Sequence, residues 1–140
     1  MKIYSDLSDL QMEKPTVVTI GTFDGVHLGH RSILTKISEI SQKSGLETLV
    51  MTFEPHPRTI LFPEQKDIRL LTTPQEKRWL LQCLGIQNLV EYPFSKEFAA
   101  IEPETYVRGI QMKRLMMKHL VIGYDHRFGK NRSGSIELLK

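Results

Sequence analysis

Short apolar runs typical of β-strands alternate along this chain with longer segments of helical periodicity. The runs are rich in β-branched residues and are bounded by glycine or proline, as strands of a buried sheet are. We expect strands at about 16–20, 47–53, 88–92 and 119–123. Apolar residues recur every three or four positions between them and predict helices at about 27–42, 74–84 and 103–115. This alternation predicts an α/β fold in which helices cover both faces of a mostly parallel sheet.

The length and composition are those of one ordinary globular domain. The chain has 140 residues, of which 40% are hydrophobic and 25% charged. Its formal net charge of +3 suits anionic ligands such as phosphates, but it is too small to indicate nucleic acid. No stretch approaches the ~20 apolar residues of a membrane helix, and the N-terminus lacks the apolar core of a signal peptide. We therefore expect a cytoplasmic protein with no nucleic-acid and no membrane partner.

Cys83 is the single cysteine, so no disulfide can form within the chain and a reducing compartment is expected. It lies in an apolar run with Trp79, Leu80, Leu81 and Leu84. We interpret it as a core residue rather than a nucleophile.

Unusual polar clusters directly follow the expected strands. These clusters read TFDGVHLGH, EPHP, YPFS and YDHRFGKNRSG. In parallel sheets ligands bind outside the carboxyl ends of the strands, where such clusters would meet. The distribution therefore predicts a binding site at that edge of the sheet.

The segment GTFDGVHLGH, residues 21–30, has the features of an anion site. Gly21 and Gly25 permit a tight turn, and Gly29 permits close approach to the helix that follows. The free amides at the start of that helix attract phosphate. His27 and His30 are three residues apart and therefore share one helix face, from which both imidazoles can donate to phosphate oxygens.

Other interpretations of the two histidines stay open at this point. His27 can be a helix cap and His30 a surface residue. The pair can also belong to a metal site, if His56 or His126 supplies further ligands. The helix dipole disfavours imidazolium while bound phosphate favours it, so the sequence leaves the charge of both rings undecided.

The segment GTFDGVHLGH resembles the signature of the bacterial FAD synthetases, within the HxGH nucleotidyltransferase superfamily. TFEPHP, residues 52–57, and GYDHRFGKNRSG, residues 123–134, match further blocks of that family in the same order. The resemblance implies a Rossmann-like three-layer sandwich. It also implies the FMN adenylyltransferase domain of a bifunctional riboflavin kinase/FAD synthetase, which converts FMN and ATP to FAD and pyrophosphate with Mg²⁺.

By that resemblance His27 and His30 are the catalytic residues, which hold the ATP phosphates and stabilise charge as pyrophosphate leaves. The FMN phosphate is already an anion, so alignment and charge neutralisation suffice without a strong base. Mg²⁺ would bind mainly through phosphates and water, and no metal ligand is assigned. Asp24 is the nearest acidic candidate, or else it only fixes the turn. The residues expected to bind ATP or its phosphates are Gly21, Thr22, Phe23, Asp24, Gly25, Gly29, Asp125, Arg127 and Arg132.

The resemblance also implies a flavin side of the cleft. Two prolines would make an extended, rigid rim from TFEPHP and hold His56 outward. Phe128 could stack on a planar ring, whereas Tyr106 lies on an apolar helix face where core packing competes with flavin contact. The family more often has an aromatic residue at the position of His126, whose role stays open. The residues expected to contact flavin are Pro55, His56, Pro57, Phe128 and Tyr106.

A further family block, with a Ser/Thr-rich turn and a phosphate-binding arginine, is not found before Lys140. The family's riboflavin kinase barrel is not found either. We therefore expect residues 1–140 to be a C-terminally truncated adenylyltransferase domain that binds ATP or FMN weakly and turns over poorly. The alternatives are a non-catalytic nucleotide-binding module, an HxGH enzyme with another phosphate acceptor, and a metal hydrolase. The sequence assigns no oligomeric state.

Overall fold

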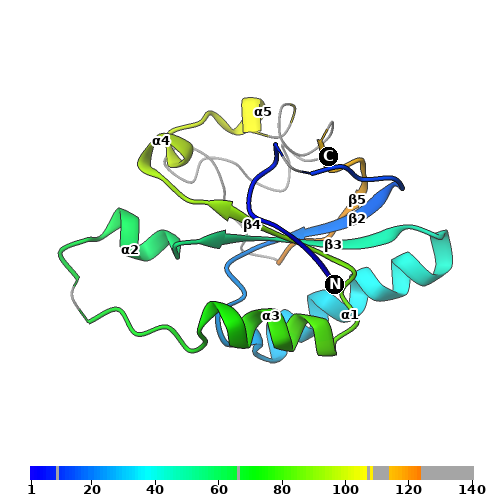
Figure 1. The fold of residues 1–140 in the computed structure, drawn as a ribbon, viewed down its shortest axis with the longest axis horizontal. Helices are drawn as coiled ribbons and strands as arrows, with labels where there is room; N and C mark the ends of the chain where they lie inside the picture. Colours follow the sequence, from blue (N-terminus) through cyan, green and yellow to red (C-terminus); the bar gives the residue numbers. More distant parts are fainter. Residues whose placement is uncertain (9, 66, 107, 109–113, 124–140) are drawn as a thin grey trace.

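A five-stranded parallel sheet with strand order β1-β4-β3-β2-β5 runs through the computed structural model (Figure 1). The structure describes all residues except 9, 66, 107, 109–113 and 124–140. The strands are β1 (Lys2–Tyr4), β2 (Thr16–Ile20), β3 (Glu47–Glu54), β4 (Asn88–Pro93) and β5 (Met117–Leu120). The helices are the short turn η1 (Asp24–Val26), α1 (Leu28–Ser44), α2 (Pro57–Leu61), α3 (Pro74–Cys83), α4 (Lys96–Ala99) and α5 (Pro103–Tyr106).

Successive residues of the central strands pack into different layers, as a sheet buried on both faces requires. Val17 of β2 and Val50 of β3 belong to one apolar cluster, whereas their neighbours Val18 and Met51 belong to the other. All four side chains are fully buried. The predicted α/β fold with a parallel sheet between two layers is therefore confirmed.

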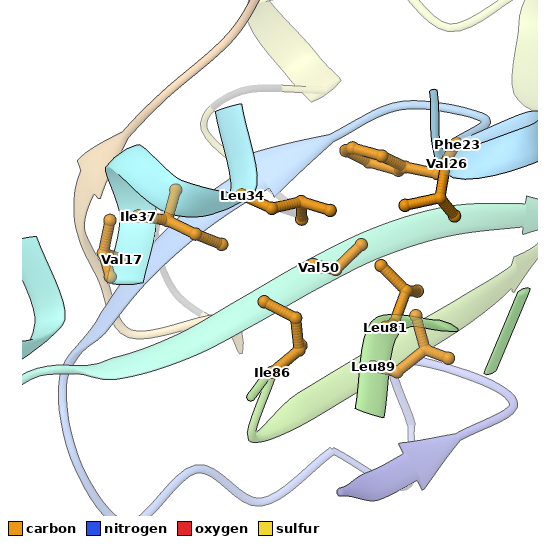
Figure 2. Close-up of a cluster of buried hydrophobic side chains, with 9 residues drawn as sticks. All are labelled: Val17, Phe23, Val26, Leu34, Ile37, Val50, Leu81, Ile86 and Leu89. Atoms are coloured by element: carbon orange, nitrogen blue, oxygen red, sulfur yellow. The ribbon is translucent and has the colours of Figure 1, made fainter. Parts of the chain in front are cut away.

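The helices α1 and α3 cover one face of the sheet, and α4 and α5 lie on the other (Figure 1). Figure 2 shows Leu34 and Ile37 of α1 and Leu81 of α3 pointing toward Val50, with Phe23 at one end of the same cluster. Truncating a fully buried leucine costs about 2–5 kcal/mol, so these contacts hold both helices firmly on the sheet. Phe23 and Val26, which follow β2, pack into this same layer, so the layer positions the chain at the end of β2.

The ends of the two long helices follow from local sequence signals. Gly45 ends α1 in a left-handed conformation (φ 67°), and its amide donates to the carbonyl of Ser41. Thr73 and Glu76 form a capping box at the start of α3, since each side chain bonds the backbone amide of the other. Both helices lie close to their predicted positions.

Some elements differ from the sequence-based expectation. The strand β1 was not expected, because three residues are too few to show a pattern, and its pairing with Asn88–Val90 of β4 creates it. The short helices α2 and α4 were not expected either. The strand β5 was expected at 119–123 but spans Met117–Leu120, because Met117 already pairs with Thr16 of β2. Pairing with a neighbour, rather than local composition, sets these limits.

The expectation that Cys83 is a core residue is wrong. Cys83 is exposed, and Trp79, one turn before it on α3, is 65% exposed. Lys77 and Leu81 are the buried residues of this helix, so its sheet-facing side lies elsewhere than the Trp79–Cys83 side. The segment carries apolar residues on more than one face, and its spacing alone did not show which face packs.

The helix expected over 103–115 is described only in part, as α5, because 107 and 109–113 lie outside the described residues. Leu115, expected on its apolar face, is fully buried in the cluster that also contains Leu7 and Leu10. The side chain of Tyr106 is outside the described part of the chain. Of the helices that the structure describes, none combines the length and the apolarity needed to cross a membrane.

Candidate active site at the carboxyl edge of the sheet

Parallel pairing brings the carboxyl ends of β2, β3 and β4 to one edge of the sheet. Ile20 pairs with Met51, and Glu54 at the end of β3 pairs with Pro93 at the end of β4. The segments 21–30 and 55–57 leave the sheet at this edge. Two of the blocks singled out in the sequence are therefore neighbours in space. The third block, 123–134, lies outside the described residues except for Gly123, and with it Asp125, His126, Arg127, Phe128 and Arg132.

The strand β2 also marks the place where the order of successive strands in the sheet reverses. The chain passes from β2 to β3 and then to β4 on one side, whereas β5 pairs with β2 on the other side. Ligands of open α/β sheets bind in the crevice at such a reversal. The residues that follow β2 lie directly at this position.

The β2 loop, which we define as residues 21–27, has an unusual backbone. Phe23 (φ 50°), Gly25 (φ 75°) and Val26 (φ 42°) are all left-handed. Only glycine adopts this conformation freely, and other residues pay about 1–3 kcal/mol each when the surroundings impose it. The side chains of Phe23 and Val26 are both 1% exposed, so core packing imposes it here.

The prediction that Phe23 contacts ATP does not hold for its side chain, which is buried with Leu34 and Leu81. Its ring lies 5.0 Å from the ring of His30, centroid to centroid. The Phe23 side chain therefore packs against His30 from the core side.

Asp24 ties the β2 loop to the chain that precedes α3. Its carboxylate accepts hydrogen bonds from the amides of Leu71 (2.8 Å) and Thr72 (3.0 Å). Partial burial by itself would raise the pKa of Asp24, but these amides bond the charged form and hold the pKa below its ordinary value of 3.8. The carboxylate oxygens are thus occupied, which favours the turn-fixing role of Asp24 over a metal ligand.

His27 and His30 form a stacked pair. Their ring centroids are 3.7 Å apart and the planes are inclined by 20°. His27 is the exposed N-cap residue of α1, and its side chain makes no capping hydrogen bond. His30 is half-buried, and its Nδ1 is a buried atom without a hydrogen-bond partner among the described residues. A buried polar atom of this kind calls for a partner from outside.

Burial lowers the pKa of His30, the charge of His27 lowers it further, and the carboxylate of Asp24 acts in the opposite direction. The net pKa is below the ordinary value of 6.5, so the fold favours the neutral form of the His30 ring when nothing is bound.

Gly29 lies between the two histidines at the start of α1. A Cβ at this position would lie 3.3 Å from the His27 ring. The absence of a side chain at Gly29 therefore leaves room for the stacked imidazoles, in addition to the close approach expected from the sequence. The 17-residue helix α1 has no acidic residue in its first turn, and its free amides and dipole favour an anion there.

The EPHP segment differs from the extended rim that we expected. Pro57 is the first residue of α2, and the Glu54–Pro55 peptide bond is cis. His56 caps α2, since its Nδ1 accepts the amide of Arg58 at 3.1 Å. Proline fits the first helical position because it has no amide proton to satisfy, so the second proline starts a helix instead of extending the strand.

The two blocks are also linked electrostatically. Burial is the main cause that lowers the pKa of His56, and the charges of Lys77 and Arg58 act in the same direction. Asp24 raises this pKa in part, while His56 in turn lowers the pKa of Asp24. His56 and the β2 loop therefore share one electrostatic environment.

Lys77 lies beside the candidate site and was not expected there. It is 6% exposed, and its ammonium donates to the carbonyl of Thr22 at 3.2 Å and to the hydroxyl of Thr52 at 3.1 Å. Lys77 lies one turn before the buried Leu81 on α3. A lysine at that spacing from a core leucine was the signal that could have found it.

A sequence model of the FAD synthetase family matches residues 9–140. The chain belongs to the FAD synthetase family. The resemblance found in its GTFDGVHLGH segment is thereby confirmed.

Named relatives of this chain agree with the family match. Bifunctional riboflavin kinase/FMN adenylyltransferases of Buchnera aphidicola subsp. Acyrthosiphon pisum and Escherichia coli K12 are 36% identical over 141 residues and 34% identical over 142 residues. Each match covers all of this chain and 45% of the relative. A crystal structure described as a macrolide-efflux protein from Streptococcus pneumoniae has a TM-score of 0.86 at 28% identity, over 98% of this chain and 45% of that one. The chain thus spans less than half the length of these relatives.

The described part of the chain contains no group of three or more His, Cys, Asp or Glu side chains that could hold a metal ion. The interpretation of His27 and His30 as a metal pair with His56 as third ligand therefore gains no support from these residues. His126, the other ligand considered, lies outside the described part. Within the described site the donors suit phosphate better than a protein-bound metal.

Proposed function

We propose that this chain transfers the adenylyl group of ATP to FMN, which yields FAD and pyrophosphate. An oxygen of the FMN phosphate attacks the α-phosphorus of ATP and forms a new P–O bond. The bond from that phosphorus to the oxygen bridging to the β-phosphate breaks, and its electron pair leaves with pyrophosphate. The FAD synthetase match over 9–140 and the relatives named FMN adenylyltransferases support this reaction.

The observation that carries the proposal is the stacked pair of imidazoles at the start of α1, 3.7 Å apart, with a buried nitrogen that has no described partner. Both rings lie at the position where the strand order reverses, beside the free amides of α1. We assign to His27 and His30 the binding of the ATP phosphates and the neutralisation of charge as pyrophosphate leaves. Phosphate stabilises imidazolium, so His30 would take up a proton when ATP binds.

The FMN phosphate is an anion at neutral pH, so no side chain must remove a proton from it. The residues then act by aligning two anions and screening their repulsion. Mg²⁺ on the ATP phosphates would supply further charge neutralisation. Since both Asp24 oxygens accept backbone amides, the described loop offers the metal little direct ligation.

The remaining assignments rest on the family resemblance. On the flavin side we assign Pro55, His56 and Pro57, which leave the sheet at the same edge as the β2 loop. The other residues assigned to flavin are Phe128 and Tyr106, and those assigned to ATP are Gly21, Thr22, Gly25, Gly29, Asp125, Arg127 and Arg132.

The decisive experiment supplies FMN and Mg-ATP and follows FAD by chromatography together with released pyrophosphate. It uses the 140-residue chain and, in parallel, the full-length protein encoded by the gene that contains this sequence. We expect FAD and pyrophosphate in equal amounts, and neither when riboflavin replaces FMN, because riboflavin lacks the attacking phosphate.

The alternatives give other results in the same assay. Nucleotide binding without pyrophosphate release would indicate a non-catalytic module. Pyrophosphate release with nicotinate mononucleotide, phosphopantetheine or glycerol phosphate, but not with FMN, would indicate another acceptor. Either result would contradict the proposed function.

A further inference from the structure

A lysine side chain is buried directly beneath the β2 loop. The geometry points to Lys77 as a positioning residue that fixes the Thr22 carbonyl and, through it, the loop that leads to His27. The expected effect of Lys77 on ATP binding rests on the proposed function, whereas its effect on the loop does not. Nothing in the family match or in the names of the relatives assigns this residue.

Lys77, Thr22 and Thr52 form a closed triangle of hydrogen bonds. The ammonium of Lys77 donates to the Thr22 carbonyl (3.2 Å) and to the Thr52 hydroxyl (3.1 Å). The Thr52 hydroxyl donates to the same Thr22 carbonyl at 3.0 Å. One carbonyl therefore accepts two hydrogen bonds, and α3, β3 and the β2 loop are joined at a single point.

The stretch before α3 holds the loop at a second point. The hydroxyl of Thr72 accepts the amide of Gly25 at 3.1 Å, and Asp24 accepts the amides of Leu71 and Thr72. The two anchors are three residues apart, and Phe23 with its left-handed backbone lies between them. Fixing both ends of this short stretch acts together with core packing to hold the strained Phe23 in place, and with it the Phe23 ring against His30.

The cation itself is costly for folding. A buried ammonium loses its hydration, and neither of its hydrogen-bond partners in the triangle carries a charge. Burial is the main cause that lowers the pKa of Lys77. The carboxylates of Glu54 and Glu91 act in the opposite direction and offset part of this shift. Glu91 is itself held by Arg78 in a two-bonded ion pair. Replacing a buried charge with an apolar side chain of similar shape is often neutral for stability, so a purely structural role would not require lysine here.

The first test compares Lys77→Met with the wild-type protein by hydrogen exchange and thermal unfolding. Methionine has nearly the same length and no charge. We expect exchange of the amides in 21–30 to rise about tenfold, while exchange in 34–44 and the unfolding temperature stay close to wild type. Lys118→Met, at an exposed lysine of β5, is the matched control and should change neither segment.

The second test uses the other corner of the triangle. Thr52→Val removes the hydroxyl and should loosen 21–30 as Lys77→Met does, whereas Thr52→Ser keeps the hydroxyl and should restore wild-type exchange. Because both side chains act on one carbonyl, the double variant Lys77→Met/Thr52→Val should be clearly less affected than the product of the single effects.

The functional readout is the equilibrium affinity for Mg-ATP, measured by calorimetry. We expect Lys77→Met to weaken it about tenfold, because a loosened loop must be ordered again on binding. Unchanged exchange in 21–30 together with unchanged ATP affinity in a folded variant would overturn the inference. So would unfolding of the variant or exchange raised equally over the whole chain, since Lys77 would then be a general structural residue. If wild type makes no FAD but Lys77→Met still loosens 21–30, the proposed function fails and the positioning role stands.

Discussion

Asp24 and Thr72 are joined by two hydrogen bonds, both accepted by the Asp24 carboxylate. The Asp24 carboxylate accepts the amide of Thr72 at 3.0 Å and its hydroxyl at 3.2 Å, while that same hydroxyl oxygen accepts the amide of Gly25 at 3.1 Å. These hydrogen bonds link Thr72 to Gly25 and Asp24, which are 47 and 48 positions away in the chain, at the end of β2. The shape of the candidate phosphate site depends on this contact, which no local pattern in the sequence reveals.

Asp24→Asn should lower the free energy of unfolding by about 1–2 kcal/mol, because an amide group cannot accept from two backbone amides with both its atoms. It should also weaken ATP binding, since the β2 loop loses an anchor. Urea unfolding and ATP titration check both effects. Asp67→Asn, at an exposed aspartate, is the control. Equal stability of the two variants would mean that the Asp24 carboxylate serves something other than the turn.

His27→Ala and His30→Ala should each weaken ATP binding about tenfold or more, which corresponds to the loss of a charge-assisted hydrogen bond to phosphate. Binding of FMN alone should change little. Calorimetric titration with each ligand separates the two effects, and His119→Ala, at an exposed histidine on β5, is the control. ATP affinity that stays at the wild-type value in both variants would remove the imidazoles from the phosphate site.

The stability of the protein should fall as the pH drops below about 6.5. The pKa of His30 lies below its ordinary value of 6.5 in the fold, chiefly through burial, and returns to that value on unfolding. Between the two values the unfolded chain binds more protons, so stability present above pH 6.5 is lost as the pH falls toward the folded pKa. The pKa of His56 is shifted in the same direction and acts likewise.

The pH effect is measured by urea unfolding at pH 7.5 and 5.5. His30→Gln should reduce the difference between the two pH values, and His119→Gln should leave it unchanged. The pKa of Asp24 is lowered from 3.8, so its stabilising contribution is present above that pH and does not vary in this window. A difference that is as large in His30→Gln as in wild type would contradict the prediction.

Gly25→Ala should cost more stability than Gly45→Ala. Both glycines are left-handed (φ 75° and 67°), so alanine strains the backbone at either position by about 1 kcal/mol. A Cβ on Gly25 would also lie 2.7 Å from Cδ1 of Leu71, whereas a Cβ on Gly45 would meet nothing within 4 Å. Denaturant unfolding measures the excess, which Leu71→Ala should relieve in part in the double variant, because the Leu71 Cβ at 3.0 Å remains. Equal costs at both glycines would mean that Leu71 moves aside freely.

Much of the fold could be predicted because its signals are local. The β-branched run at Thr16–Ile20 and the apolar spacing of α1 each state a periodicity that a few neighbouring residues carry. Gly45 and Thr73 mark helix ends through backbone and capping chemistry that acts within one turn. The candidate site segment GTFDGVHLGH was recognised for the same reason, since its glycines and histidines lie within ten residues of each other.

The failures share the opposite cause. The strand β1 exists only through its pairing with β4. Cys83 was misplaced and Lys77 was not singled out because α3 carries apolar residues on more than one side, and contact with the sheet selects which side is buried. Phe23 was expected at the ligand, yet its left-handed backbone turns the ring into the core.

The sequence by itself determined the class of fold, the family and the segment that holds the histidines, since each follows from residue types at short, regular spacing. Only the tertiary structure decided which helix face is buried, which atoms anchor the β2 loop, and that a lysine from α3 lies under it. Those choices depend on contacts between distant segments, whose free energies are settled by packing and burial once the sheet has formed and not by the local chain.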